Sequence, residues 1–285
     1  MNRTMKAAPP ADDQRTEARI REHYEVEREL AQRLREADRA ARRTLYNDVY
    51  DELYRRVPDH PLIARAAEPA AREPQIRKLT GWVSPFLGRD GTFLEIGPGD
   101  CLFSFALAGR CKFVYAVDVS DGYVDATRKP ANFALTISDG TSVPVPAASV
   151  DVAFSDQLME HLHPDDALEQ LAEIQRALKP GGTYIVITPN RFSGPHDVSR
   201  FFSDRAEGFH LREYTNRELA AILRRAGFAS VRAGVPLRGR LATLPVGPFA
   251  VLEAILGALP AALRTAVART RPVRALLGVR LIATK

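Results

Sequence analysis

Hydrophobic positions follow two different patterns along the chain, and the change comes near Gly91. Before it, over residues 16–57, apolar side chains recur at spacings of three, four and six, and the stretch contains no Pro or Gly. Such spacing predicts one or two amphipathic helices whose charged face is solvated. Four prolines then interrupt the pattern, and residues 75–86 are predicted as a short helix that leads into the next domain. Residues 1–14 are polar and are interpreted as a flexible arm before an N-terminal helical region over 15–75.

Beyond Gly91 short apolar runs alternate with helical patterns, which is typical of βαβ units around a parallel sheet. Strands are predicted over residues 92–96, 113–117, 133–138, 150–155, 183–188, 229–235 and 278–284. Helices are predicted between most of them, over residues 102–109, 122–128, 164–178 and 216–226. The pattern therefore predicts an α/β domain over residues 76–285.

An insertion over residues 236–277 separates the last two predicted strands. Its apolar segment, 241–263, is almost long enough to cross a membrane, but three prolines and Glu253 interrupt it. We therefore favour a buried or lid helix, or an interfacial helix, over a membrane span. Residues 236–285 contain eight Arg or Lys and one acid, so they carry a formal charge of +7, whereas residues 1–235 carry −2. A basic tail beside an apolar stretch favours an anionic surface over a nucleic-acid groove, which needs interleaved aromatic residues.

The composition of the 285 residues excludes several protein classes. Hydrophobic residues make up 45%, charged residues 26% and aromatic residues 8%, so the chain is neither disordered nor collagenous. Two cysteines are too few for a secreted disulfide framework or a cysteine-rich zinc site, and the N-terminus lacks the apolar core of a signal peptide. We therefore expect a cytoplasmic protein, with peripheral contact at the inner face of a membrane through residues 241–271 as a further hypothesis.

Candidate chemistry begins where the first predicted strand ends in Gly97-Pro98-Gly99 before a helix. Glycines at such a turn let the backbone approach a ligand closely, beside the positive end of the helix. Nineteen residues past Gly99, Asp118 ends the second strand, where a carboxylate can accept both hydroxyls of a ribose; the alternative is a helix cap. Asp139 follows the third strand in an Asp-Gly turn, where it can accept from the amine of adenine or simply hold the turn.

Two classes of nucleotide cofactor compete for this pattern. A nicotinamide site needs a third glycine where this chain has Leu102. Glu95 stands two places before the first glycine, and a carboxylate there suits a cation better than a pyrophosphate. S-adenosylmethionine supplies an ammonium and a sulfonium group and no phosphate, so the residues favour this cofactor.

These motifs resemble those of the class I S-adenosylmethionine-dependent methyltransferases, in particular the branch that methylates small molecules, lipids and glycans. The resemblance covers residues 76–228 and the final strand. It is carried by Glu95-Ile96-Gly97-Pro98-Gly99, Asp118, Ser138-Asp139-Gly140, the fourth-strand motif from Phe154 to Leu162, and Leu178-Lys179-Pro180-Gly181-Gly182-Thr183.

The resemblance implies both a fold and a cofactor site. The fold is a Rossmann-like, doubly wound sheet of seven strands, mostly parallel with an antiparallel last strand, with the N-terminal helices and the insertion added to it. The cofactor is S-adenosylmethionine, and its implied binding residues are Glu95, Gly97, Pro98, Gly99, Cys101, Asp118, Val119, Asp139, Gly140 and Gln157. Cys101 departs from the family, which often has a third glycine there, so its small side chain is expected beside the cofactor or under the helix.

His196 and His161 are the candidate catalytic residues. His196 lies next to Asp197 in a polar loop after the fifth strand, which suits a general base, and a purely structural loop histidine fits equally. His161 follows Glu160, and the alternative to a substrate base is a structural pair at a helix start. Some quinone-ring O-methyltransferases of the family are similar here but have a Glu in place of Gln157 and bind a divalent metal. A neutral amide weakens such a site, so no metal is predicted.

The residues and the resemblance together predict an S-adenosylmethionine-dependent methyltransferase (EC 2.1.1.-) that O-methylates a small-molecule, lipid-linked or saccharide acceptor. A catalytically inactive binding module with the same fold, and a methyltransferase of a soluble natural product, are the alternatives. No nucleic-acid partner is expected, because the sequence contains no RNA-binding motif or aromatic and basic patch. The acceptor atom and the oligomeric state stay open at this point.

Overall fold

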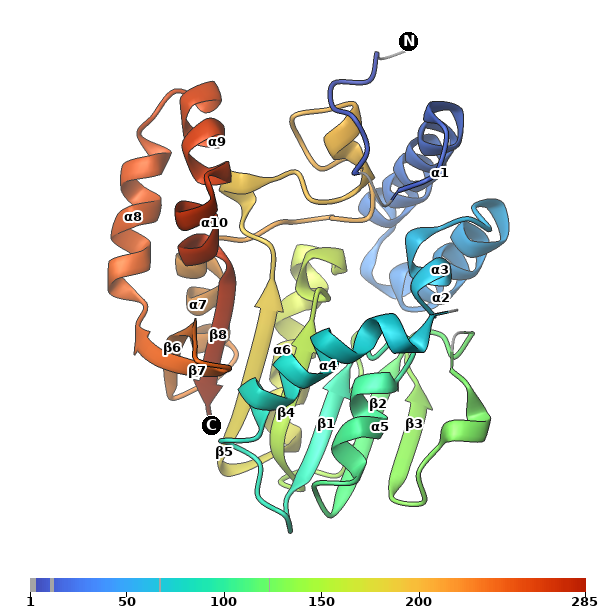
Figure 1. Cartoon of the computed structure of the whole chain (residues 1–285). Helices are drawn as coiled ribbons and strands as arrows, with labels where there is room; N and C mark the ends of the chain where they lie inside the picture. The colour runs from blue at the N-terminus through green and yellow to red at the C-terminus, as the bar shows by residue number, and fades with distance from the viewer. Residues whose placement is uncertain (1–3, 11–12, 67, 123) are drawn as a thin grey trace.

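An eight-stranded sheet organises the structure, a computed structural model that describes residues 4–10, 13–66, 68–122 and 124–285 (Figure 1). The strand order is β3-β2-β1-β4-β5-β8-β6-β7. Strands β1 to β5 run parallel to one another, whereas β8 is antiparallel to both β5 and β6, and β7 is antiparallel to β6. The strands are β1 Thr92–Ile96, β2 Phe113–Asp118, β3 Phe133–Ile137, β4 Val150–Asp156, β5 Leu178–Thr188, β6 Ser230–Leu237, β7 Arg240–Pro245 and β8 Val279–Thr284. The predicted doubly wound sheet with an antiparallel last strand is confirmed.

The predicted number of strands is wrong by one, because the start of the insertion is a strand. Residues 241–245 belong to β7, which forms a hairpin with β6 through Arg238 and Gly239. Both turn residues have positive φ, 48° and 79°, which is what a tight two-residue hairpin requires. The rest of the insertion forms three helices, α8 Gly247–Gly257, α9 Ala261–Arg269 and α10 Arg271–Leu277. Pro248 and Pro260, two of the residues that interrupt the apolar run, lie at the start of α8 and α9 and so mark helix boundaries, whereas Glu253 lies inside α8.

Four helices precede the sheet, α1 Glu17–Glu36, α2 Arg39–Arg56, α3 Pro61–Ala66 and α4 Pro69–Val83. Thr16 and Asp38 cap α1 and α2 by accepting backbone N–H groups, which fixes where each helix begins. The helix predicted over 75–86 is α4, which begins earlier than predicted, at Pro69, and contains Pro74. In the predicted helix 122–128 the described residues form one 3-10 turn, Ala126–Arg128, and position 123 lies outside the described residues.

The described part of the predicted flexible arm is held against the domain. The Lys6 N–H donates to the carbonyl of Phe201 at 2.7 Å, and the Lys6 ammonium pairs with Asp204 at 2.5 Å. Met5 packs beside a buried cluster that joins α1 to the segment around Phe202. Residues 4–10 are thus anchored at the surface, while 1–3 and 11–12 lie outside the described residues.

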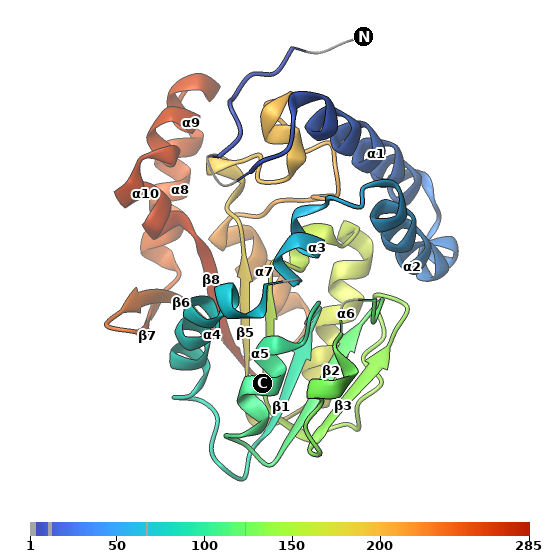
Figure 2. The ribbon, with the colours of Figure 1, turned by 45° about the vertical axis from the view of Figure 1, so that its right-hand side comes forward.

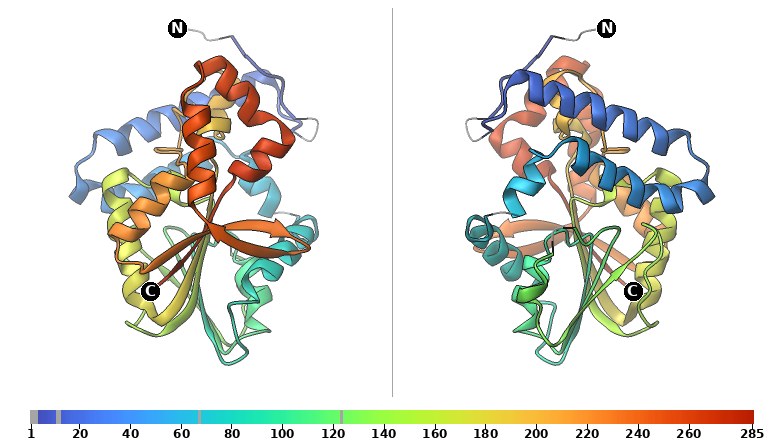
Figure 3. Two further views of the ribbon diagram at one scale, coloured as in Figure 1. Left: turned by 90° about the vertical axis from the view of Figure 1, so that its left-hand side faces the viewer. Right: turned by 90° about the vertical axis from the view of Figure 1, so that its right-hand side faces the viewer.

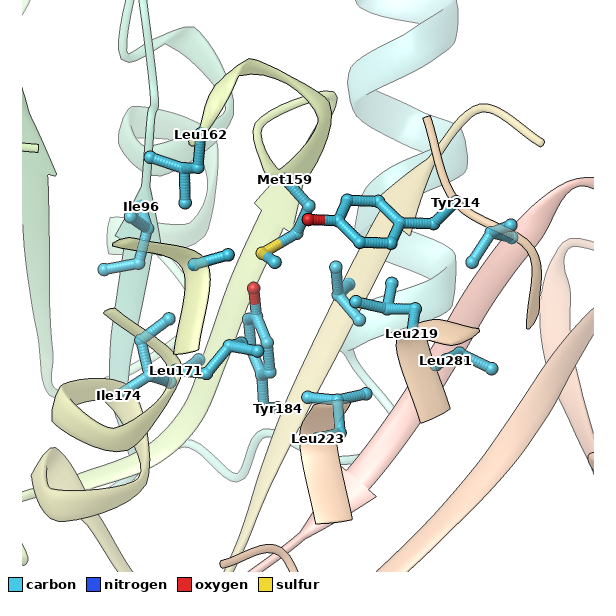
Figure 4. Close-up of a cluster of buried hydrophobic side chains, with 14 of the residues drawn as sticks. Ile96, Met159, Leu162, Leu171, Ile174, Tyr184, Tyr214, Leu219, Leu223 and Leu281 are labelled. Atoms are coloured by element: carbon cyan, nitrogen blue, oxygen red, sulfur yellow. The ribbon is translucent and has the colours of Figure 1, made fainter. Parts of the chain in front are cut away.

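Helices cover both faces of the sheet and its upper edge. Helices α4 and α5 (Leu102–Ala108) lie over one face, and α6 (Pro164–Ala177) and α7 (Asn216–Arg225) lie over the other (Figures 1 and 2). Helices α1 to α3 lie above the carboxyl ends of the parallel strands, and α8 to α10 stand on the side of β8 (Figure 3). Buried side chains from α6, α7 and the strands interdigitate in the core shown in Figure 4, among them Leu171, Ile174, Tyr184, Leu219 and Leu223.

A buried ion pair locks the N-terminal helices to α6. The Arg42 guanidinium donates to both oxygens of Asp166, at 2.6 and 2.8 Å, and both side chains are buried. The Tyr46 hydroxyl donates to the same carboxylate at 2.9 Å and accepts from the His163 N–H at 2.8 Å. Buried apolar residues of α1 and α2 belong to the same core cluster as the sheet, so these helices are an integral part of the domain.

Helix α8 is held in place by its one acidic residue. Glu253 is buried and accepts from the side-chain amides of Asn190 and Asn216 at 2.9 and 3.0 Å. Its carboxylate also accepts backbone N–H groups at the start of α7. Across the described residues, none of the helices has both the length and the apolar character needed to span a bilayer.

Candidate active site

A left-handed turn follows β1 and shapes the floor of the candidate site. Gly97 and Gly99 have φ values of +68° and +57°, and Cys101, which precedes α5, has a φ of 58°. A Cβ atom at position 97 would make a close contact of 3.0 Å with the end of the Leu158 side chain, and the positive φ favours glycine there. At position 99 a Cβ would meet nothing within 4 Å, which leaves the backbone of this turn open on that side.

Asp118, at the end of β2, holds this turn from beside it. Its Oδ2 accepts the Gly99 N–H at 2.9 Å and its Oδ1 accepts the Val119 N–H at 2.7 Å. Burial raises the pKa of Asp118 to about 6 against the opposing effect of these backbone bonds. Each carboxylate oxygen has a second lone pair, so Asp118 can still accept ligand hydroxyls.

Glu95 and Asp100 place two further carboxyl groups at the turn. Glu95 is buried and accepts from the Ser104 hydroxyl at 2.5 Å, and burial raises the pKa of its carboxyl to about 8. Asp100 pairs with Arg72 of α4 at 2.7 Å, which ties the N-terminal helices to the glycine turn. Burial also raises the pKa of Asp156 at the end of β4. Buried carboxyls next to an open backbone favour a cationic ligand, whose charge would restore their ionised form.

These residues surround a cavity of about 300 Å³, within the range of small-molecule sites. Most of the predicted site residues line it, and they are Glu95, Gly97, Pro98, Gly99, Asp118, Val119, Gly140, Gln157 and His161. The carboxyl ends of β1, β2 and β4 all contribute, so the cavity lies at the edge where open α/β sheets bind ligands.

Three predicted residues do not line this cavity. Cys101 packs into the core beneath α5, the second of its two expected placements, and burial raises the pKa of its thiol, which argues against a reactive group. The Asp139 carboxylate instead accepts the N–H groups of Thr141 and Ser142 at 2.9 and 2.6 Å, which is the turn-holding alternative. His196 faces a second cavity, described below.

His196 is also not paired with Asp197, its predicted neighbour. The His196 Nε2 lies 3.0 Å from the Ser193 hydroxyl and 3.2 Å from the Asn190 carbonyl. Asp197 accepts N–H groups from its own loop and from Gly208. Burial lowers the pKa of His196, so the ring is neutral at neutral pH. The structure therefore favours the loop-holding alternative for this histidine.

Sequence reasoning missed one wall of the cavity, which comes from the N-terminal helices. Tyr46, Tyr50 and Tyr54 of α2 all line it, together with Leu62 and residues of α4. The tyrosines are spaced by four, which places them on one face of the helix. This spacing is the signal in the sequence that could have indicated a cavity wall. Without the fold, however, it looks the same as a row of buried core residues on one face of a helix. The Tyr46 ring also closes over Gly140, where a Cβ would lie 2.8 Å from it.

His161 faces the cavity in front of a buried polar cluster. Burial raises the pKa of Glu160 to about 7 and lowers that of His161 to about 3. Burial also opposes charge on His210, but its bond to Glu213 and the nearby Glu160 and Asp197 outweigh this and raise its pKa to about 9. Glu160 Oε1 and His161 Nδ1 are buried and have no hydrogen-bond partner within the described parts of the chain.

The groups at this cluster could also act as metal ligands. Glu160, His161 and His210 bring one carboxylate oxygen and two ring nitrogens within 4.8 Å of one another. A metal ion would have to displace the proton that the surrounding carboxylates hold on His210. The absence of a metal therefore stays a prediction.

A second such group lies in the N-terminal region and consists of His23, Glu27 and His60. Arg15 lies 2.8 Å from the His23 Nδ1, and the Leu62 N–H donates to the His60 Nδ1 at 3.2 Å. Both rings therefore carry their proton on Nε2, which faces Glu27 at 2.7 and 3.7 Å. This arrangement fits a hydrogen-bonded cluster, since a metal would need the opposite tautomer.

Comparison with known proteins agrees with this geometry. Residues 94–186 match the family model described as a methyltransferase domain. A Mycolicibacterium smegmatis protein named as a probable S-adenosylmethionine-dependent methyltransferase is 33% identical over 144 residues, 50% of this chain and 52% of that protein. A Mycobacterium tuberculosis protein with the same description is 33% identical over 141 residues, 48% of each chain. Residues 94–186 thus match a methyltransferase domain, and about half of the chain is similar to probable S-adenosylmethionine-dependent methyltransferases.

The fold of the methyltransferase domain is also shared with solved structures. A methyltransferase solved in complex with the Haloferax volcanii Trm112 activator has a TM-score of 0.54 at 18% identity, covering 79% of this chain and 96% of that one. The chain spans about half the length of the curated relatives that it matches. S-adenosylmethionine is the cofactor of this class, and the open glycine turn, the Asp118 carboxylate and the buried Glu95 fit its hydroxyl and cationic groups. The roles of the single residues stay predictions.

Proposed function

We propose that this chain methylates a hydroxyl oxygen of a small-molecule, lipid-linked or saccharide acceptor. The observation that carries the proposal is the cavity itself, in which acids suited to a cationic nucleoside and one neutral histidine face the same space. When bound, S-adenosylmethionine supplies an activated methyl group on its sulfonium. Transfer is an in-line displacement, so the protein has mainly to align the reactants and exclude water.

Each side of the cavity has a defined task in this proposal. Asp118 accepts the ribose hydroxyls, and Glu95 faces the cationic end of the cofactor in its ionised form. Tyr50 and Tyr54 of α2 cover the cavity and exclude water from it. The His161 ring, which lines the cavity and is unprotonated, is the proposed acceptor of the proton that leaves the acceptor hydroxyl.

A lipid-linked acceptor is supported by the surface of the insertion. Val251 and Ile255 of α8 and Leu263 of α9 are each at least half exposed, at 60%, 60% and 50%. Exposed apolar side chains beside arginines are typical of helices that lie at an anionic membrane surface. We propose that residues 241–271 make peripheral contact with such a surface. A double substitution Val251→Ser and Ile255→Ser should then reduce retention on anionic vesicles, and unchanged retention would exclude the contact.

Calorimetric titration of S-adenosylmethionine and S-adenosylhomocysteine into the full chain tests the cofactor assignment. Wild type should bind both, and Asp118→Ala should weaken binding at least tenfold because the ribose hydroxyls lose their acceptor. Asp204→Ala is the matched control, since this exposed carboxylate does not line the cavity, and it should bind both ligands as wild type does. No binding by the folded wild type would leave only the inactive-module alternative.

An acceptor assay then tests the proton transfer. With any acceptor that is methylated, His161→Ala should lower kcat by about 10²-fold or more without changing the dissociation constant of S-adenosylhomocysteine. An unchanged kcat would assign His161 a structural role and would favour an acceptor that needs no base.

A further inference from the structure

A second cavity, of about 360 Å³, lies beside the first. It is lined by the end of β5, by the loop that holds His196, by α10 and by the start of β8. Gln157 lines both cavities, so the two spaces meet at this residue. The backbone fixes Gln157 there, since it has a φ of 57° and its N–H donates to the Ile187 carbonyl at 2.8 Å.

Three arginines line this second cavity, Arg271, Arg274 and Arg280. Among the described residues that line it there is no Asp or Glu, and the other polar groups are neutral side chains such as Asn190 and Ser193. Arg271 and Arg274 are spaced by three on α10, so they share one face of the helix, and both are exposed.

The charges of Arg271 and Arg274 are not neutralised locally. Neither Arg271 nor Arg274 has an ion pair or a side-chain hydrogen bond to the described residues. Arginines elsewhere behave differently, since those of α1 and α2 repeatedly pair with acids, for example Arg19 with Asp59, Arg33 with Glu52 and Arg56 with Glu29. The second cavity thus gathers cationic groups that the protein does not itself compensate.

Arg280 is the most fixed of the three. Its Nη1 donates to the carbonyls of Ala275 and Gly278 at 3.3 Å, and the guanidinium lies 5.7 Å from the centre of the Trp82 ring. A Cβ at position 278 would lie 2.7–2.9 Å from the guanidinium, so glycine makes room for it. Burial lowers the pKa of Arg280, opposed by the charge of Asp156, but an arginine keeps its proton at any physiological pH.

We propose that the second cavity binds a phosphoryl group, or a similar oxyanion, carried by the methyl acceptor. Guanidinium groups present forked donors that match the oxygens of a phosphoryl group. An acceptor whose anionic group lies between Arg271, Arg274 and Arg280 extends past Gln157 toward the first cavity. The acceptor is therefore a phosphorylated sugar, phosphate ester or lipid phosphate. This inference rests on the proposed function for the identity of the reaction, but the anion site is defined without it.

Binding of inorganic phosphate to the full chain tests the site directly. Three proteins are compared by calorimetry at low salt: wild type, the variant Arg271→Gln with Arg274→Gln, and the control Arg224→Gln with Arg225→Gln. The control removes two exposed arginines of α7 that line neither cavity, so the loss of net charge is matched. Wild type and control should bind phosphate equally, and the α10 variant should bind at least tenfold more weakly.

The same samples separate this inference from the proposed function. S-adenosylhomocysteine should bind all three proteins with the same dissociation constant, because neither pair of arginines lines the first cavity. Absence of phosphate binding by wild type, or equal binding by the α10 variant and the control, would overturn the anion site. Failure of wild type to bind S-adenosylhomocysteine would overturn the proposed function while the phosphate comparison still decides the site.

Two further probes distinguish the sources of the phosphoryl group. Glucose 6-phosphate represents a soluble ester, and phosphatidylcholine vesicles with or without phosphatidic acid represent a lipid phosphate. Tighter binding of glucose 6-phosphate than of inorganic phosphate, lost in the α10 variant, assigns a soluble acceptor. Retention that requires phosphatidic acid and is lost in the α10 variant but not in the control assigns a lipid acceptor. If both probes bind the α10 variant as they bind the control, the proposal fails.

Discussion

Removing the guanidinium of Arg42 is expected to destabilise the whole domain. Arg42 and Asp166 are 3% and 1% exposed, and the guanidinium donates two bonds to the carboxylate and a third to the Ala37 carbonyl at 2.7 Å. The substitution Arg42→Met keeps much of the apolar stem but leaves the Asp166 carboxylate buried with the Tyr46 hydroxyl as its remaining side-chain donor.

The size of the effect follows from this burial. Breaking a buried ion pair by removing one partner costs about 3–5 kcal/mol, because the remaining charge stays desolvated. Arg39 provides the matched comparison, since it also joins α2 to α6, by pairing with Glu169, but its side chain is 58% exposed. Exposed pairs contribute about 0–1 kcal/mol, so Arg39→Met should change the free energy of unfolding by no more than that.

Urea unfolding followed by circular dichroism measures both effects on the same scale. The difference between Arg42→Met and Arg39→Met should be at least about 2 kcal/mol. The double variant Arg42→Met with Asp166→Asn should recover part of the loss, because it removes the uncompensated charge and keeps an acceptor for Tyr46. Equal destabilisation by the two single substitutions, or no recovery in the double variant, would refute the assignment of Asp166 as a buried charge.

Three further predictions follow from the site and its supports. Burial raises the pKa of Glu95 to about 8, and a bound cation favours the carboxylate, so S-adenosylmethionine should bind more tightly as the pH rises toward 8. Binding should also release protons, which calorimetry in two buffers of different ionisation enthalpy measures. Glu95→Gln should abolish both the pH dependence and the proton release. Glu253→Ala leaves the amides of Asn190 and Asn216 without their acceptor and should cost about 2–4 kcal/mol in the free energy of unfolding by urea titration; a loss below about 1 kcal/mol would contradict the anchoring role. Gly140→Ala should cost about 1–3 kcal/mol and weaken S-adenosylhomocysteine binding, because φ is +84° and the new Cβ meets the Tyr46 ring; normal thermal stability and binding would contradict this.

Local patterns were sufficient for the parts of the fold that depend on neighbouring residues. The strand at 92–96 has the predicted bounds because its apolar run meets the glycines of the turn directly. The helix at 164–177 is predicted to within one residue, since Pro164 begins it and its apolar face is regular. The ring of acids and glycines around the first cavity follows from the same local order, because parallel strands bring their carboxyl ends to one edge.

Features that depend on distant partners could not be predicted in this way. Asp139 has the position of a ligand-binding acid, yet its carboxylate accepts hydrogen bonds from the hydroxyl and N–H groups of its own loop. The strand β7 exists because an edge of β6 is available to pair with it, and its short run LATLP carries no strong signal of its own. The tyrosines of α2 became part of the site only through the packing of α2 above the sheet.

This shared construction of the cavity affects where the chain can be divided. The segment that matches the family model, 94–186, begins after every residue that the N-terminal helices contribute to the cavity wall. A protein truncated to that segment would lose the tyrosine face and the partner of Asp100, and would expose the apolar surface that Leu30, Leu34 and Val49 now cover. Such a fragment would be prone to aggregate and would present its cofactor side to water. Fusion partners, tags and domain exchanges therefore belong outside residues 4–285, and a boundary chosen by sequence similarity alone would pass through the site.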